Sequence, residues 1–293
     1  MRIIGVACGA GARDARCADG PEALRKGGIV SRLQRSGLDA AWSATLKPPS
    51  GTESLPAVCA VGAQLGRRTH DLVSRGRFPV VLGGDHSCAI GTWKGIARAL
   101  APLGPLGLVW IDAHMDAHTP ETTPSGMLHG MPVASLLGCG EPRLAAAGIE
   151  VLDPRRVCLI GVRSFEEGEA ALLARLGVKV IQMEEVRRRG LTAVMAEALA
   201  IARGGIGGYG VSIDLDALDP WDAPGVGIAV RGGIRAVELR QALAQLGRDP
   251  ALAALEIAEF NPYRDRNGVT ARLVAEIIES LLAPAQAELV LAA

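Results

Sequence analysis

The sequence has no excess of either charge and no long apolar run. Its 293 residues contain 31 Lys and Arg against 31 Asp and Glu, so the formal net charge is zero. Nucleic acids and anionic membrane surfaces attract basic proteins, and a neutral chain indicates neither as a partner. No apolar run approaches the roughly 18 residues that a transmembrane helix requires. We therefore expect neither nucleic acid nor a membrane as a partner.

The sequence also lacks a paired cysteine motif, an internal repeat and a low-complexity linker. Its six cysteines are scattered, and none forms a CxxC pair. This pattern is typical of reduced thiols in a cytoplasmic protein rather than of a disulfide framework. The N-terminal stretch "MRIIGVACGAGARD" predicts a first strand instead of a signal peptide, because glycines interrupt its short apolar run. We expect one cytoplasmic domain that spans residues 1–293.

Short apolar and β-branched runs alternate with stretches of helical spacing. The expected strands are 2–7, 79–84, 106–112, 157–162, 178–183, 209–216 and 252–260. The expected helices are 54–75, 88–101, 167–176, 190–203, 235–247 and 269–282. Continuous apolar strands that alternate with helices predict an α/β fold whose mostly parallel sheet is covered on both faces. Such sheets bind ligands at the carboxyl ends of their strands.

Acids and histidines follow three of these expected strands. They occur in "VVLGGDHS" (80–87), "WIDAHMDAHTP" (110–120) and "VSIDLDALDP" (211–220). Buried carboxylates cost several kcal/mol each unless something compensates them. Because residues two apart in an extended chain point to the same side, we expect Asp112, His114 and Asp116 to face one site. Asp214 and Asp216 are expected to do the same.

The candidate ligands supply four carboxylates and two neutral imidazoles, a charge that two divalent cations neutralise. They are His86, Asp112, His114, Asp116, Asp214 and Asp216. Oxygen ligands with some imidazole fit Mn²⁺ better than Mg²⁺, and the absence of a thiolate argues against a structural zinc. Paired metals about 3.5–4 Å apart lower the pKa of a shared water and supply hydroxide at neutral pH. A lone DxHxD is often a chance match or a capping turn, but three such strand ends together predict two manganese ions.

These segments resemble the signatures of the ureohydrolases, the arginase and agmatinase family. The resemblance rests on "GGDHS" (83–87), "DAHMD" (112–116) and "SIDLDALDP" (212–220), and "DGPEALRKGGI" (19–29) and "EIAEFNP" (256–262) extend it almost end to end. It implies a three-layer α/β/α sandwich and a homo-oligomer, a trimer or hexamer. It also implies two Mn²⁺ ions on the six candidate ligands, and a hydrolase of linear amidines that releases urea from a guanidino compound.

The resemblance also assigns catalytic roles. Glu259, in "AEFNP", matches the acid that holds the guanidinium group, and Asp116 is expected to take the proton of the metal-bridging hydroxide. His129, in "SGMLHGMP", matches a proton-shuttling histidine, and an ordinary histidine with a pKa near 6.5 is able to protonate the leaving amine. The loop 118–138 is more similar to arginases than to agmatinases or formimidoylglutamases. It implies hydrolysis of L-arginine to L-ornithine and urea.

The expected substrate-binding residues partly depart from the arginase pattern. They are His118, Thr123, Ser125 and Glu166. Arginases usually carry Asn at the positions of His118 and Met127, aspartates at those of Ser164 and Glu166, and Thr at that of Ile228. We therefore expect the metal ligands and catalytic residues to be intact and the residues that select the substrate to be altered.

Three alternatives remain at this stage. Another ureohydrolase (agmatinase, guanidino-acid hydrolase or formimidoylglutamase) would share the metal site and differ in substrate. A two-metal phosphoesterase would need basic residues near the metal motifs, and these motifs contain none. A non-catalytic binding protein on the same fold would be favoured by a missing ligand, and all six are present.

Overall fold

The computed structural model describes residues 1–145, 150–204, 207–246 and 249–282. The end of the expected helix 235–247, at residue 247, and the last part of the expected domain, residues 283–293, lie outside the described residues. Among the helices in these ranges, none is both long enough and apolar enough to cross a membrane.

In the described part of the chain, eight strands form one sheet with the order β2-β1-β3-β8-β7-β4-β5-β6. All neighbouring strands pair in parallel. The expected α/β class with a mostly parallel sheet is confirmed. The strands are β1 Arg2–Val6, β2 Ala41–Leu46, β3 Pro79–Leu82, β4 Gly107–Ile111, β5 Val157–Val162, β6 Lys179–Gln182, β7 Tyr209–Asp214 and β8 Leu252–Ala258.

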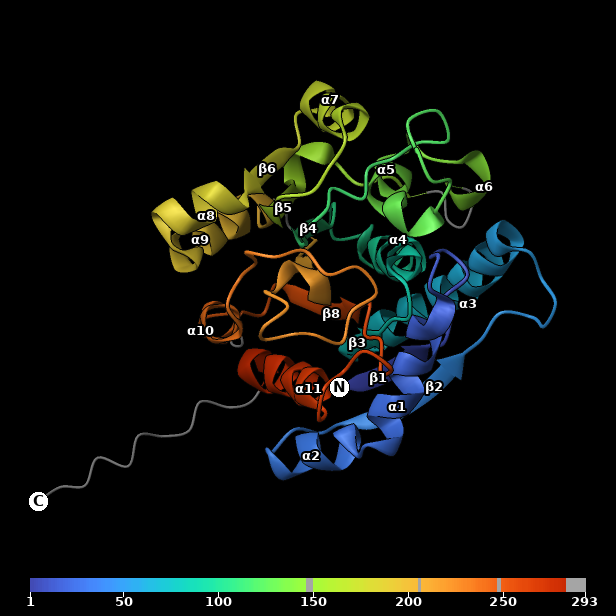
Figure 1. Ribbon diagram of the computed structural model, residues 1–293, viewed down its shortest axis with the longest axis vertical. Helices are drawn as coiled ribbons and strands as arrows, with labels where there is room; N and C mark the ends of the chain where they lie inside the picture. Colours follow the sequence, from blue (N-terminus) through green and yellow to red (C-terminus); the bar gives the residue numbers. More distant parts are fainter. Residues whose placement is uncertain (146–149, 205–206, 247–248, 283–293) are drawn as a thin grey trace, which may run out of the picture.

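Helices cover both faces of the sheet and complete the expected three-layer sandwich (Figure 1). One face packs against α2, α8, α9, α10 and α11, and the other against α3, α4, α5 and α7. The α-helices are α1 Gly20–Lys26, α2 Ile29–Arg35, α3 Ser54–Ser74, α4 Ala89–Leu100, α5 Pro132–Leu136, α6 Pro142–Ala145, α7 Glu167–Leu176, α8 Met183–Arg189, α9 Leu191–Ala202, α10 Ala236–Ala244 and α11 Val269–Leu282. Short 3-10 turns are η1 Ala15–Asp19, η2 His86–Cys88, η3 Leu128–Gly130, η4 Pro154–Arg156 and η5 Leu215–Ala217.

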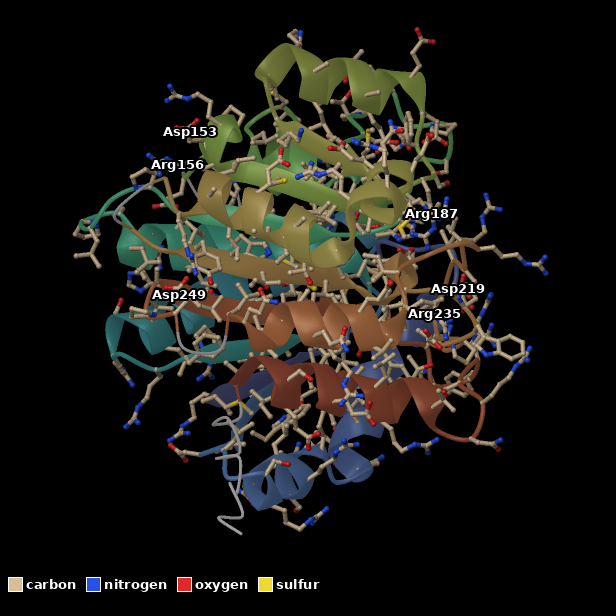
Figure 2. All side chains as sticks on the ribbon, turned by 90° about the vertical axis from the view of Figure 1, so that its left-hand side faces the viewer. Asp153, Arg156, Arg187, Asp219, Arg235 and Asp249 are labelled. Carbon is tan, nitrogen blue, oxygen red and sulfur yellow. The ribbon has the colours of Figure 1, made fainter. Side chains whose placement is uncertain are left out.

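The two ends of the strands form opposite ends of the molecule. Figure 2 shows Arg187, Asp219 and Arg235 together at one end, and Asp153, Arg156 and Asp249 at the other. Asp219 lies in the segment that follows η5, beyond the carboxyl end of β7. The first of these ends is therefore the carboxyl edge of the sheet, where a ligand site is expected.

Helices α3 and α4 pack at unusually close range. A Cβ atom on Gly91 would lie 2.5 Å from the carbonyl oxygen of Gly62, and one on Gly95 would clash with the carbonyl of Gly66. Glycine is required where two backbones approach this closely. Because α4 follows η2 directly, this contact sets the position of the turn that begins with His86.

Some elements differ from the sequence-based expectation. The strand β2 and the helices α1, α2 and α8 were not expected, because each is short and β2 is an edge strand with only one buried residue. The expected strands 106–112, 209–216 and 252–260 end earlier, at Ile111, Asp214 and Ala258. The polar residues that follow therefore lie in turns at the sheet edge, and the expectation of an extended chain through Asp112–Asp116 and Asp216 was wrong.

Candidate metal centre and active site

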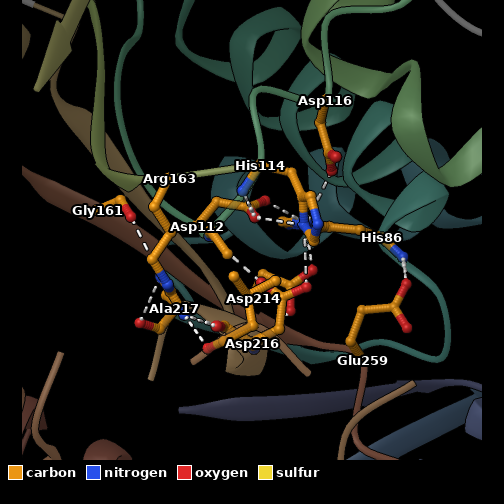
Figure 3. Close-up of polar contacts among 12 residues, drawn as sticks. His86, Asp112, His114, Asp116, Gly161, Arg163, Asp214, Asp216, Ala217 and Glu259 are labelled. Carbon is orange, nitrogen blue, oxygen red and sulfur yellow. Dashed lines mark hydrogen bonds and ion pairs between the residues drawn. The ribbon is translucent and has the colours of Figure 1, made fainter. Parts of the chain in front are cut away.

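Four adjacent central strands supply the expected site residues. His86 follows β3, Glu259 follows β8, Asp214 ends β7, and Asp112 follows β4. The order β3-β8-β7-β4 places these carboxyl ends side by side, although the residues are far apart in the sequence. Figure 3 shows their side chains converging on one region.

One group of side chains surrounds the Nδ1 atom of His86. This nitrogen lies 3.2 Å from one carboxylate oxygen each of Asp112, Asp116 and Asp214. Among the described residues, neither His86 Nδ1 nor Asp116 Oδ2 has a hydrogen-bond partner, although both atoms are buried. Unpaired buried polar atoms that face each other are the ligand geometry of a cation, since a cation satisfies all of them at once.

A second group shares Asp112 with the first. The Nδ1 atom of His114 lies 3.0 Å from Asp216 Oδ2 and 3.5 Å from Asp112 Oδ1. Within each group, one ligand atom per residue lies within 4.8 Å of the others. The structure thus brings all six expected ligands together as two neighbouring groups, with Asp112 between them.

Turn conformations, not strand alternation, produce this convergence. The Asp214 carboxylate accepts a hydrogen bond from the N–H of Asp216, which folds the chain into η5. Asp116 and Glu259 have φ angles of 49° and 67°, in the left-handed region that residues other than glycine rarely adopt. Backbone strain of this kind concentrates at functional sites, where the surrounding fold compensates it.

Buried neighbours that the sequence analysis missed hold His86 and Asp112. Trp110 stacks on the His86 ring with centroids 4.1 Å apart, and its Nε1 donates to Asp112 Oδ2 at 2.9 Å. His86 Nε2 lies 3.0 Å from the hydroxyl of Ser212, which donates to Glu256. These two hydrogen bonds make Nε2 of His86 a donor and leave the lone pair of its Nδ1 atom directed toward the carboxylates. The sequence contains a signal for Glu256, which is the one polar residue of β8.

The electrostatics of the cluster favour cations. Burial raises the pKa values of Asp214 and Asp216, and the charge of neighbouring carboxylates raises them further. Burial and the charge of Asp112 raise the pKa of Asp116 to about 7. Asp116, Asp214 and Asp216 therefore resist ionisation, and divalent cations remove this penalty by neutralising them.

Glu259 lies beside the cluster and pairs with His129. Its Oε1 atom accepts hydrogen bonds from the backbone N–H of His86 and from Nδ1 of His129, both at 3.0 Å. Burial lowers the pKa of His129, but the hydrogen bond and charge of Glu259 outweigh this effect and raise the pKa to about 10. His129 is therefore protonated at neutral pH, in contrast to the expected pKa near 6.5.

A cavity of about 210 Å³ opens above these residues. This is below the roughly 300–1,000 Å³ of drug-sized sites and fits a small substrate. In its lining, His118 Nε2 lies 2.9 Å from Glu166 and 3.3 Å from Glu169, an acid that was not expected. The cavity is lined by His114, Asp116, His118, Pro124, Ser125, Met127, His129, Gly130, Ser164, Glu166, Glu169, Asp214, Asp216, Ile228 and Glu259.

Two expected substrate-binding residues differ in their placement. Ser125 lines the cavity, and its hydroxyl accepts from the N–H of Met127 at 3.3 Å. Thr123 is not among the lining residues, and its hydroxyl accepts from the N–H of Gly126 at 3.0 Å. Thr123 thus stabilises the turn that presents Ser125 and Met127.

Fold and site together define a class of protein: an α/β sandwich with two groups of carboxylate and imidazole ligands under a small cavity at the carboxyl edge of its sheet. Comparison with known proteins narrows this class. The family described as "Arginase family" matches residues 1–283. The arginase of Bacillus caldovelox is 39% identical over 96% of this chain and 97% of its own length, and that of Bacillus subtilis is 37% identical over 90% of each.

Solved structures agree with the sequence comparison. The native structure of the Bacillus caldovelox arginase has a TM-score of 0.90 and 38% identity, and covers 97% of this chain and 98% of that one. The chain therefore belongs to the arginase family, and it is a hydrolase of that family.

Proposed function

We propose that this protein is a manganese-dependent arginase, which hydrolyses L-arginine to L-ornithine and urea. The observation that carries the proposal is the pair of ligand groups that share Asp112, with the His86 Nδ1 atom unpaired among three carboxylates. This donor set fits the implied metals, because four carboxylates and two imidazoles balance two divalent cations. Mn²⁺ accepts both donor types readily. When bound at these residues, two cations would supply positive charge at the reacting carbon and would lower the pKa of the attacking water.

The protein's own residues then bind the substrate and move protons. Glu259 pairs with the guanidinium group and holds its carbon over the ligand cluster, within reach of the attacking water. The buried Asp116 Oδ2 atom has no hydrogen-bond partner and accepts a proton from that water. The water oxygen bonds to the guanidinium carbon, and Asp116 passes the proton to the alkyl nitrogen. The bond from this carbon to that nitrogen then breaks, the remaining hydroxyl proton returns to Asp116, and urea and ornithine result.

His129 is the acid for the leaving amine. Its raised pKa depends on its pairing with Glu259. A bound guanidinium cation competes for Glu259 and repels the protonated imidazole. Both effects lower the pKa of His129 when substrate is present, which makes it a better proton donor at the moment of reaction.

The acids in the cavity lining support recognition of an ammonium group. Glu166 and Glu169 lie there with His118, and no Lys or Arg is among the described lining residues. The α-ammonium of arginine fits these acids, and its carboxylate would rely on His118 and the hydroxyl of Ser125. Because Met127 and Ile228 offer no polar side chain, agmatine hydrolysis is the second candidate: agmatine carries the amine and lacks the carboxylate.

Urea release from L-arginine and agmatine, side by side, tests the proposal. Purified protein loaded with Mn²⁺ is expected to release urea and ornithine from arginine with the higher kcat/KM. Asp116→Asn protein purified in parallel serves as the control for contaminating host enzymes and is expected to be inactive. Urea from agmatine alone would replace the arginase assignment with the second candidate. No urea from either substrate by protein that contains metal would overturn both.

The proposal extends to the state of the protein in the cell. All six cysteines are free thiols, which supports a reducing compartment such as the cytoplasm. We also propose that the chain forms a single domain and that several copies assemble into a trimer or hexamer, as its family resemblance implies.

A further inference from the structure

Arg163 lies directly after β5, beside the ligand cluster, and within the described ranges its side chain donates only to backbone carbonyls. Its Nη2 donates to Asp216 at 2.7 Å, Val230 at 2.8 Å and Leu218 at 3.4 Å. Nη1 donates to the carbonyls of Gly161 and Ala217 at 3.1 and 3.2 Å, and Nε donates to that of Arg231 at 3.3 Å. Figure 3 shows the guanidinium group between the end of β5 and the turn that carries Asp216.

The backbone of the same residue holds the other ligand segment. The N–H groups of Arg163 and Ser164 both donate to the carbonyl of Ala113, at 2.8 and 3.0 Å. Ala113 lies between Asp112 and His114, and its own N–H donates to Asp216 Oδ1 at 3.3 Å. Arg163 therefore joins the two chain segments that supply Asp112, His114 and Asp216, the second ligand group.

We propose that Arg163 is a positioning residue for this second group, and that it sets the metal affinity of the group by fixing the turn at Asp216 against the segment at Ala113. The inference rests on the proposed two-metal centre. Arg163 acts through the backbone that carries the ligand side chains. Its side-chain hydrogen bonds within the described residues all go to carbonyls and not to a ligand carboxylate. Arg163 thus adds no hydrogen bond to the ligand oxygens.

The chemistry of arginine suits this task. The carbonyls of Asp216, Ala217 and Leu218 stand at the end of η5, and the last carbonyls of a helical turn lack partners within it. A guanidinium group offers five N–H donors in a rigid planar fork, so one side chain satisfies carbonyls from three segments in a fixed arrangement. Lysine has a single flexible donor centre and cannot span them. Partners that hold metal ligands in place typically contribute about 10–100-fold to metal affinity.

The test is Mn²⁺ binding to metal-free protein, measured by titration calorimetry for wild type, Arg163→Gln and Arg163→Lys. Wild type is expected to bind two ions. In Arg163→Gln, one of the two Kd values is expected to rise about 10–100-fold and the other to change little. In Arg163→Lys, the same Kd is expected to lie between the values of wild type and Arg163→Gln. Urea release is expected to recover at excess Mn²⁺ with an unchanged KM, because the substrate contacts remain.

Arg187→Gln is the matched control. Arg187 donates to the carbonyl of Gly232 at the same edge of the molecule (Figure 2), close to the segment that Arg163 holds, and this bond goes to neither ligand segment. This variant is expected to bind two ions with wild-type Kd values. Thermal unfolding of each metal-free variant records any general loss of stability separately.

The outcomes separate this inference from the proposed function. If wild type binds no Mn²⁺, the two-metal centre itself fails. If wild type binds two ions and folded Arg163→Gln binds them with the same Kd values, the positioning role is overturned while the proposed function stands. The role is equally overturned if metal-free Arg163→Gln and Arg163→Lys both fail to fold, since Arg163 is then a general structural residue.

Discussion

At the scale of single residues, the candidate site uses backbone conformations that most side chains avoid. Asp116 and Glu259 both have positive φ angles, which cost about 1–3 kcal/mol each outside glycine. Hydrogen bonds around them compensate, since the N–H of Glu259 donates to the carbonyl of Gly84 at 2.8 Å and its carboxylate accepts from His86. These bonds aim the Glu259 carboxylate at the cavity without involving it in the ligand cluster.

Glu259→Gln is expected to lower kcat/KM for L-arginine by about 10²–10³-fold, because removing one partner of a buried ion pair typically costs 2–5 kcal/mol. Glutamine keeps the oxygen that accepts from His86, so the metal content should stay close to wild type, whereas loss of the ion pair with His129 is expected to lower the unfolding midpoint. Steady-state urea assays measure the effect. Glu184→Gln, at an exposed position on α8, is the control. Wild-type kcat/KM in the Glu259 variant would refute its role at the guanidinium group.

At the scale of elements, close helix packing positions the turn that bears His86. The contact between α3 and α4 depends on paired glycines, Gly62 with Gly91 and Gly66 with Gly95. Glycine lowers the intrinsic helix propensity of both segments by up to about 1 kcal/mol per residue. The packing gained across two long helices outweighs this cost. The sequence predicted both helices within a residue or two, whereas the reason for their glycines became visible only in the contact between them.

We predict that Gly95→Ala destabilises the protein although alanine is the better helix former. The new methyl group would overlap the carbonyl of Gly66, and overpacking of this kind costs about 1–3 kcal/mol. Urea denaturation followed by circular dichroism measures the change. Gly27→Ala, at the end of α1 with a φ of −69° that alanine adopts, is expected to change the free energy of unfolding by less than about 1 kcal/mol. Equal free energies of unfolding for the Gly95 variant and wild type would contradict this prediction, because α3 and α4 would then move apart without loss of stability.

At the scale of the whole molecule, the sheet order brings the site together. Strands β3 and β8 pair directly, so that His86 and Glu259 meet across 173 residues of chain. The cluster then spans the ends of four strands, and a cation bound there links segments from much of the fold. Metal binding and the stability of the fold are coupled for this reason.

Removal of metal is therefore expected to lower the thermal unfolding midpoint of the entire protein. At free Mn²⁺ a hundredfold above Kd, each site adds about 2.7 kcal/mol to the free energy of unfolding. Differential scanning calorimetry with chelator and with graded Mn²⁺ should show a midpoint that rises with metal concentration. Asp214→Asn, which weakens the first ligand group, should show a smaller rise. An unfolding midpoint that is the same with chelator and with Mn²⁺ would contradict the coupling.

Properties of short sequence segments predicted most of the secondary structure, the fold class and the candidate metal ligands. Apolar runs and helical spacing are properties of short segments, and they predicted the central strands, the longer helices and the α/β class. The six candidate ligands were predicted because acids and histidines after buried strands need compensation. Charge balance alone then pointed to two divalent cations.

Only the tertiary structure decided how these pieces meet. The order β3-β8-β7-β4, the sharing of Asp112, and the bonds from Arg163 and Ser212 depend on contacts between distant segments. Strand pairing in a parallel sheet is selected by burial of both faces and by the crossover helices, and no periodicity within a strand encodes its neighbour. The sequence by itself therefore determined which chemical groups stand at the sheet edge, and the fold decided which of them lie together.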